Sequence, residues 1–242
     1  DWGESSLILD LFTREQGRIA VAAKGAKRPY SQMRAVLLPF QRIHVTLGRI
    51  RTGSADSEIQ TLRAAEWGGG AAMLTGGALF SGFYLNELLM KLLARHDPHP
   101  ALFDAYALAL PALTAAGDAA VQAALRAFEL TLLREVGVLP DLSLATLTQQ
   151  PLQASQTYAL WPELGVSASR TDNSASNGAD HPGALTGEVF LALNAALVQG
   201  DACALRHACG SALPELKSTL RGLLHYHLGS DRLRTRQVML TL

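Results

Sequence analysis

The sequence predicts an α+β protein in which a small antiparallel β-barrel is followed by an all-helical domain that contains a short hairpin insert. Short β-prone segments separated by turns occupy roughly the first 66 residues, with no helical pattern between them. Long segments with helical spacing of apolar residues follow a glycine cluster at residues 67–70. We therefore expect a barrel domain at residues 1–70 and a helical domain at residues 71–242.

Apolar runs that end at turn residues mark the strands of the barrel. They lie at residues 5–12, at residues 17–24, around Ile43 and at residues 58–66. Residues 25–31 contain Gly, Pro and Ser and predict a mobile basic loop, after which residues 35–48 resume an apolar, β-branched run. The oligonucleotide-binding barrel is one fold of this kind. The chain opens at Asp1, and we expect a few residues of the first strand to be missing.

The glycine cluster predicts a hinge, because it lacks the spacing of the phosphate-binding glycine motifs. Residues 79–95 predict a helix that is apolar over most of its circumference and must be buried by neighbours. Residues 167–183 are rich in Ser, Asn, Asp and Gly and predict a disordered insert. The remaining elements are a helix from Pro100 to about residue 116, a helix capped by Asp118 and stopped by Gly137 and Pro140, a hairpin at residues 158–166, a helix from Thr186 to Gly200, a shorter helix with both cysteines, and a last helix from Ser211 to Gly229.

The composition is that of a soluble globular protein, with 48% hydrophobic and 17% charged residues. The chain has no uncharged apolar run of about 18 residues and no signal-like start, so we expect a cytoplasmic protein without membrane association. Cys203 and Cys209 lie six positions apart in one expected helix, which fits neither a disulfide framework nor a paired C-x-x-C zinc site. We expect no cofactor and no stoichiometric zinc.

Positive charge is concentrated in residues 14–51, which hold nine Lys and Arg against one acid, Glu15, although the whole chain is neutral. Residues 67–205 carry the opposite excess, with five basic against twelve acidic residues, and residues 232–236 are basic again. One side of the molecule should therefore attract an anionic polymer, of which nucleic acid is the obvious candidate. The alternative is a β-rich segment with solvated arginines on its outer face.

Six stretches resemble the RecO family of bacterial recombination mediators, in the order that the family has them. They are ESSLILDLFTREQGRI, AAKGAKR, LLPFQRI, IQTLRAAE, LFSGFYLNELLMKLLARHD and LRAFELTLLREVG, and together they cover most of residues 4–137. The C-terminal LRTRQ is similar to the family's closing basic motif. No single stretch is diagnostic, but their occurrence in the family's order makes the resemblance specific.

The resemblance implies an oligonucleotide-binding barrel, a helical domain and a non-enzymatic role in DNA repair. The implied activities are binding of single- and double-stranded DNA, annealing of complementary strands, and loading of the RecA recombinase onto strands covered by single-strand-binding protein. RecR and the C-terminal tail of single-strand-binding protein are the implied partners, and the nucleoid is the implied location. Many members carry a four-cysteine zinc module after the third helix, but residues 142–166 hold no cysteine, so that metal is not expected here.

The DNA-binding residues are expected on the barrel and the C-terminal tail. Only Phe12, Tyr30 and Phe40 supply rings near the charge, so base stacking should be minor and phosphate contact should dominate. Phosphate contact suits an annealing protein, because it leaves the base edges of both strands free. The expected contacts are Arg14, Arg18, Lys24, Lys27, Arg28, Arg34, Arg234 and Arg236.

The resemblance also implies docking of an acidic peptide that ends in an apolar residue, which needs an apolar pocket beside one or two cations. The expected partner-binding residues in the acidic middle of the chain are Lys91, Arg95, Arg126 and Arg134. The alternative for Arg126 is an ordinary surface pair with Glu129 or Asp118.

Two other functions fit parts of the sequence. A metal-dependent hydrolase would draw ligands from residues 95–99, but Pro98 interrupts this turn, and metal ligands have to converge from ordered elements. Its further candidate ligands are Cys203, His207, Cys209, His225 and His227. A protein-interaction scaffold without DNA binding fits the neutral net charge.

Overall fold

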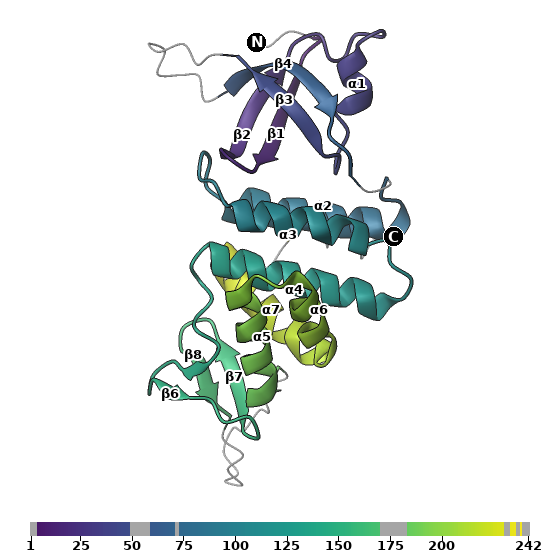
Figure 1. Ribbon diagram of the computed structural model, residues 1–242. Coiled ribbons are helices and arrows are strands. Elements are labelled where there is room, and N and C mark those ends of the chain that lie inside the picture. The colour runs from purple at the N-terminus through teal and green to yellow at the C-terminus, as the bar shows by residue number, and fades with distance from the viewer. Residues whose placement is uncertain are drawn as a thin grey trace.

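A computed structural model describes residues 4–48, 59–70, 73–169, 183–229, 233–235 and 238. The fold class is α+β, as expected, with a strand-rich N-terminal part followed by a helical part. Figure 1 shows the barrel at one end, two helices against it, and the remaining helices with a small sheet at the other end. Within the described residues, no helix is both long and apolar enough to cross a membrane.

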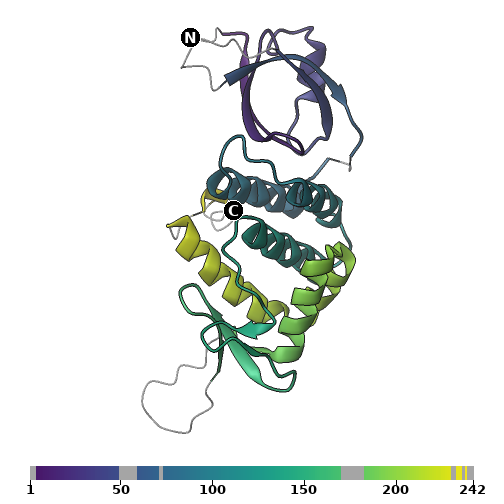
Figure 2. The same ribbon diagram turned by 60° about the vertical axis from the view of Figure 1, so that its left-hand side comes forward.

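In the described residues, the strands of the barrel are β1 (Leu7–Thr13), β2 (Gly17–Ala23), β3 (Ile43–Leu47) and β4 (Ile59–Trp67). The sheet order is β1-β2-β4-β3, and Figure 2 shows the sheet curling round into a ring. The side chains of Ile19, Val21 and Leu62 fill its interior. Neighbouring strands are antiparallel except β2 and β4, which run parallel. This pair departs from the expected antiparallel barrel, because the long connection between the two strands carries the chain back to the same end.

A short helix, α1 (Gln32–Val36), ends on Ala35 and Val36, the first two residues of the run for which the sequence predicted extended chain. Met33 and Leu37 both pack against the barrel core. Their spacing of four residues places them on one face of a helical turn, and the main-chain N–H of Leu37 donates to the carbonyl of Met33 at 2.9 Å. Burial of this face therefore outweighs the β-propensity of Val36.

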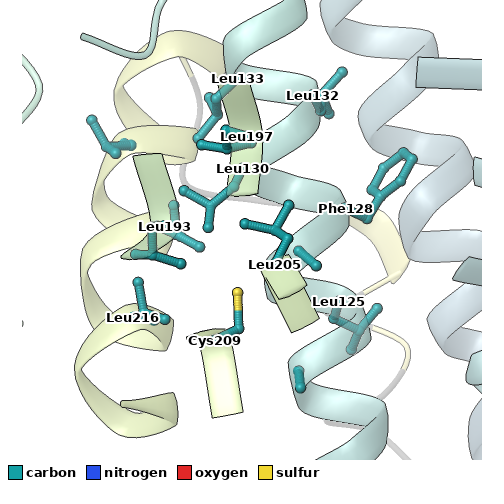
Figure 3. Packing of buried hydrophobic residues seen from close by; sticks show 14 of the residues in the cluster. Leu125, Phe128, Leu130, Leu132, Leu133, Leu193, Leu197, Leu205, Cys209 and Leu216 are labelled. Carbon is teal, nitrogen blue, oxygen red and sulfur yellow. The ribbon is translucent and has the colours of Figure 1, made fainter. Parts of the chain in front are cut away.

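Six helices make up most of the helical domain. They are α2 (Gly76–Leu92), α3 (Pro100–Ala112), α4 (Asp118–Glu135), α5 (Gly187–Gln199), α6 (Ala202–Gly210) and α7 (Leu213–Leu228). Their apolar faces meet in one core, and Figure 3 shows Leu130 of α4, Leu193 of α5, Leu205 of α6 and Leu216 of α7 around Cys209. A helix that is apolar over most of its circumference, as α2 is, needs neighbours of this kind.

Some helix ends follow the sequence signals and others differ by one to four residues. Thr186 caps α5 with its side chain, and Gly229 ends α7 in the left-handed conformation, as expected. Asp118 is the first helical residue of α4 rather than its cap, since Gly117 holds the cap position with φ of +103°. The expectation that Ser211 caps the last helix is wrong, because Ser211 ends α6 and its hydroxyl donates to the carbonyl of Ala208.

Short strands follow α4. They are β5 (Leu144–Ala145), β6 (Gln150–Pro151), β7 (Thr157–Trp161), β8 (Gly165–Ala168) and β9 (Leu185–Thr186). The expected hairpin is present as β7 and β8, and β9 adds a third strand beside β7 that the sequence did not predict. The insert expected at residues 167–183 falls mostly on residues 170–182, which lie outside the described residues.

The barrel meets the helical domain through a partly buried network of charges. The carboxylate of Asp10 accepts from Nε of Arg18 at 3.0 Å and from Nη2 of Arg95 at 2.9 Å. Arg18 also donates to the main-chain carbonyls of Met90 and Leu93 at the C-terminal end of α2, where a cation is favoured. The end of the barrel formed by the β1–β2 turn therefore faces the helical domain.

Candidate functional site

The opposite end of the barrel carries a group of exposed cations, which we call the distal basic end. It consists of Lys24, Lys27, Arg28 and Arg34. β1 and β2 pair from Leu7 with Ala23 at this end to Thr13 with Gly17 at the end that faces the helical domain. The six steps from the first to the last of these seven residues, at about 3.3 Å each, separate the two ends by roughly 20 Å. Among the residues that the structure describes, no carboxylate forms an ion pair with any of the four cations.

The segment that carries Lys24, Lys27 and Arg28, for which the sequence predicts a mobile basic loop, forms hydrogen-bonded turns. The N–H of Lys27 donates to the carbonyl of Ser5 at 3.0 Å, and the N–H of Arg28 donates to the carbonyl of Gly25 at 3.1 Å. The side chain of Ala26 is fully buried in the barrel core. The small apolar residue between the charges therefore anchors the turn, which the breaker residues alone do not reveal.

Arg14 and Arg18, also expected to contact DNA, lie at the other end of the barrel. Arg14 forms a two-point pair with Asp104 of α3, from Nε to Oδ1 at 3.1 Å and from Nη2 to Oδ2 at 3.0 Å. The hydrogen bonds from Arg14 hold the pKa of Asp104 below its usual range. Since Arg18 lies in the network around Asp10, both arginines connect the two domains.

A second feature is a pocket of about 320 Å³ between α2, α4 and α7. Apolar side chains from α4, α7 and the C-terminal segment form part of its wall, namely Leu125, Leu224 and Leu233. Arg126 of α4 and Lys217 and Arg221 of α7 also line it. An apolar wall beside several cations is the environment that an acidic peptide with an apolar end requires.

Arg126 forms a buried pair with Glu129 inside this pocket. Arg126 is 7% exposed and Glu129 is 0% exposed, and Nη2 of Arg126 lies 2.5 Å from Oε1 of Glu129. The hydroxyl of Tyr84 donates to the same oxygen at 2.7 Å. Nε of Arg126 and Oε2 of Glu129 have no hydrogen-bond partner within the described part of the chain. The pairing with Glu129 considered as the alternative is therefore present, but it is buried and lies at a pocket rather than on the surface.

The other cations expected at this site lie elsewhere. Nζ of Lys91 is 3.5 Å from the carboxylate of Glu87, Arg95 pairs with Asp10, and Arg134 is exposed near the end of α4, away from the pocket lining. The sequence did carry a signal for the missed cations, because Lys217, Arg221 and His225 follow one another at intervals of four. Residues at that spacing share one face of a helix, and all three line the pocket.

The C-terminal segment closes one side of the pocket because Glu87 of α2 holds it. The carboxylate of Glu87 accepts from the main-chain N–H of Arg234 at 2.8 Å, and from the N–H and hydroxyl of Thr235 at 3.0 and 2.7 Å. Burial opposes the charge on Glu87, but these hydrogen bonds and Lys91 outweigh it and lower its pKa. Leu233 beside them is 3% exposed. The side chain of Arg234 is exposed, and Arg236 lies outside the described residues.

Glu129, in the pocket, is predicted to make the stability of the protein depend on pH. Burial raises its pKa, against the opposing effects of Arg126, Tyr84 and Lys217. A raised folded-state pKa means that the contribution of Glu129 to stability is full below its ordinary pKa of 4.5 and is lost as the pH rises through the raised value. We expect Glu129→Gln to gain stability relative to the unchanged protein as the pH rises above 4.5, measured by urea unfolding. A relative loss would contradict this, and Glu66→Gln, at an exposed carboxylate, is the control.

The candidate metal ligands do not converge in the described residues. His99 lies 3.3 Å from Asp97 and 3.5 Å from Glu135, but no group of three His, Cys, Asp or Glu in the described part of the chain could hold a metal ion. Cys203 is exposed whereas Cys209 is buried, and burial raises the pKa of the Cys209 thiol to about 12. Zinc binds the thiolate form, so this residue is a poor ligand. Elemental analysis of the purified protein should find no stoichiometric zinc, and one zinc per chain would contradict this.

Two family models match the chain. The model described as "Recombination protein O N terminal" matches residues 1–68, and "Recombination protein O C terminal" matches residues 73–237. The relatives named "DNA repair protein RecO" include one from Polaromonas sp. (strain JS666), 48% identical over 100% of this chain and 92% of its own length. Another, from Albidiferax ferrireducens, is 47% identical over 100% of this chain and 91% of its own. A third, from Polaromonas naphthalenivorans, is 48% identical, with coverage of 100% and 92%.

Proposed function

The chain belongs to the recombination protein O family, and from that premise we propose that it is a DNA-binding mediator that anneals complementary strands during DNA repair. Family membership supports the role in repair and recombination. The distal basic end is the observation that carries the proposal of DNA binding. It presents exposed cations on a hydrogen-bonded turn and on α1, and no carboxylate in the described part of the chain forms an ion pair with them.

The proposed mechanism needs no covalent chemistry. Lys24, Lys27, Arg28 and Arg34 bind phosphates of a strand and release its condensed counterions, which provides affinity independent of sequence. The repulsion between two complementary strands is lowered when their phosphates are partly neutralised, and their base edges stay free to pair. Arg234, which is exposed beside α2, and Arg236 are proposed to contact a longer strand at a second place, because the C-terminal segment lies on the helical domain and not at the distal basic end. Arg14 and Arg18 hold the barrel against the helical domain.

The pocket is the proposed docking site for the acidic C-terminal tail of single-strand-binding protein. Its apolar wall takes the apolar last residue of the tail, and Lys217 and Arg221 at its edge attract the acidic residues. Docking there brings the protein to covered strands, where it helps RecA to load. RecR is a further proposed partner, for which we assign no surface.

Titration of labelled single- and double-stranded oligonucleotides at several salt concentrations tests the DNA-binding role. We expect binding of both, with affinity that falls linearly on a log–log scale as salt rises. The absence of salt-dependent binding would contradict the proposal and favour a protein-interaction scaffold.

A further inference from the structure

Tyr30 is almost fully exposed, with 98% of its surface accessible, compared with 65% for Trp67 and 48% for Ile8 in the same domain. It is the third residue of a β-turn in which the N–H of Ser31 donates to the carbonyl of Arg28 at 3.0 Å. Pro29 occupies the second position, where its fixed φ favours such a turn. The phenol ring is therefore presented to solvent by a turn of defined shape.

The chain on both sides of Tyr30 is held in place. Ala26, four residues earlier, is fully buried in the barrel core, and α1 begins two residues later at Gln32. Met33 of that helix packs against the barrel. A ring on a turn anchored at both ends loses less conformational freedom on binding than a ring on a loose loop.

The surroundings of the ring indicate its ligand. Lys27 and Arg28 precede Tyr30 in the chain, and Arg34 of α1 follows it by four residues, and all three cations are exposed. Single exposed apolar side chains are common on protein surfaces and need no explanation by themselves. A fully exposed ring flanked by cations, however, matches the way in which single-strand binders combine phosphate contact with base stacking.

We propose that Tyr30 stacks on a base of an unpaired strand whose phosphates are bound by the neighbouring cations, so that the distal basic end discriminates single strands from duplexes. This inference rests on the DNA binding proposed above. In a duplex the base faces are already stacked on one another, and only an unpaired base offers a face to the ring. Stacking occupies the face of the base and leaves its pairing edge free, which is compatible with annealing. The sequence predicts that base stacking is minor, because few rings lie near the charge. In this inference stacking involves one ring only, but that ring determines the preference for single strands.

The test compares Tyr30→Ala with Tyr30→Phe, which keeps the ring, on single-stranded and duplex oligonucleotides of equal length. We expect Tyr30→Ala to weaken single-strand binding about 5- to 150-fold, the range for loss of one stacked base, with duplex binding unchanged. Tyr30→Phe should bind both like the unchanged protein. The salt slope of Tyr30→Ala should stay the same, because no phosphate contact is lost.

Strands with abasic sites supply the matched ligand control. The unchanged protein should bind an abasic strand as weakly as Tyr30→Ala binds the normal strand, and abasic sites should cost Tyr30→Ala little more. Equal losses on single strands and duplexes, or no loss on single strands, would overturn the inference. If the unchanged protein bound neither DNA in a salt-dependent way, the proposed function itself would fail, which is a separate result.

Discussion

Replacing Lys24, Lys27 and Arg28 together by Glu is expected to flatten the log–log salt dependence of single-strand binding by about two units. Each phosphate contact on a single strand contributes a slope of about 0.7, and three contacts are lost. The side chains are exposed and lie outside the ion pairs of the described residues, so the barrel should fold normally. The measurement is fluorescence anisotropy with a labelled oligonucleotide at four or more salt concentrations.

The control for this variant changes the same kind of charge in the helical domain. Lys217→Glu combined with Arg221→Glu should leave the slope of DNA binding nearly unchanged, because both residues lie at the pocket. An unchanged slope in the barrel variant would move the DNA site away from the distal basic end. An equal flattening of the salt slope in both variants would indicate that DNA is attracted by the charge of the whole protein and not by a defined site.

The double variant Lys217→Glu with Arg221→Glu is expected to bind an acidic peptide with an apolar C-terminal residue more weakly. The expected loss of binding free energy is about 1.5–3 kcal/mol, roughly ten- to hundredfold in affinity. This is the range for a single hydrogen bond to a charged group. Both residues are exposed, whereas Arg126 is buried against Glu129. Removing Arg126 would leave Glu129 without its cation and destabilise the fold, so its effect on the peptide would be ambiguous.

Fluorescence anisotropy with a labelled peptide provides the measurement, and two controls bracket it. A peptide without its apolar last residue should bind the unchanged protein weakly, because the apolar wall of Leu125, Leu224 and Leu233 then has no ligand. The barrel variant should bind the full peptide normally. Unchanged peptide affinity in the Lys217 and Arg221 variant would place the docking site elsewhere.

Local patterns predicted most of the fold. The strands, the long apolar helix and the ends of α5 and α7 at Gly200 and Gly229 follow from spacing and capping within a few residues. The helix α1 was missed because its five residues are too few for a periodic signal, and its stability comes from Met33 and Leu37 against the barrel. Tertiary contact decides such short elements.

The candidate site was predictable only where neighbours in sequence stay neighbours in space. Lys24, Lys27 and Arg28 meet this condition. Arg14 does not, because its partner Asp104 is 90 residues away, and neither spacing nor composition reveals such a contact. Arg126 was expected at such a pocket, but the rest of the lining was missed for the same reason, since it needs α2, α4 and α7 together. Cations at intervals of four in α7 were visible, but nothing in the sequence tied them to Arg126.

The rate at which two complementary oligonucleotides anneal, followed by quenching between end labels, tests the central claim most directly. The account predicts that the unchanged protein accelerates annealing, and that the variant with Glu in place of Lys24, Lys27 and Arg28 does so far less. The Lys217 and Arg221 variant should accelerate annealing of naked strands normally. Equal acceleration by the unchanged protein and the barrel variant, or no acceleration by the unchanged protein, would contradict the account.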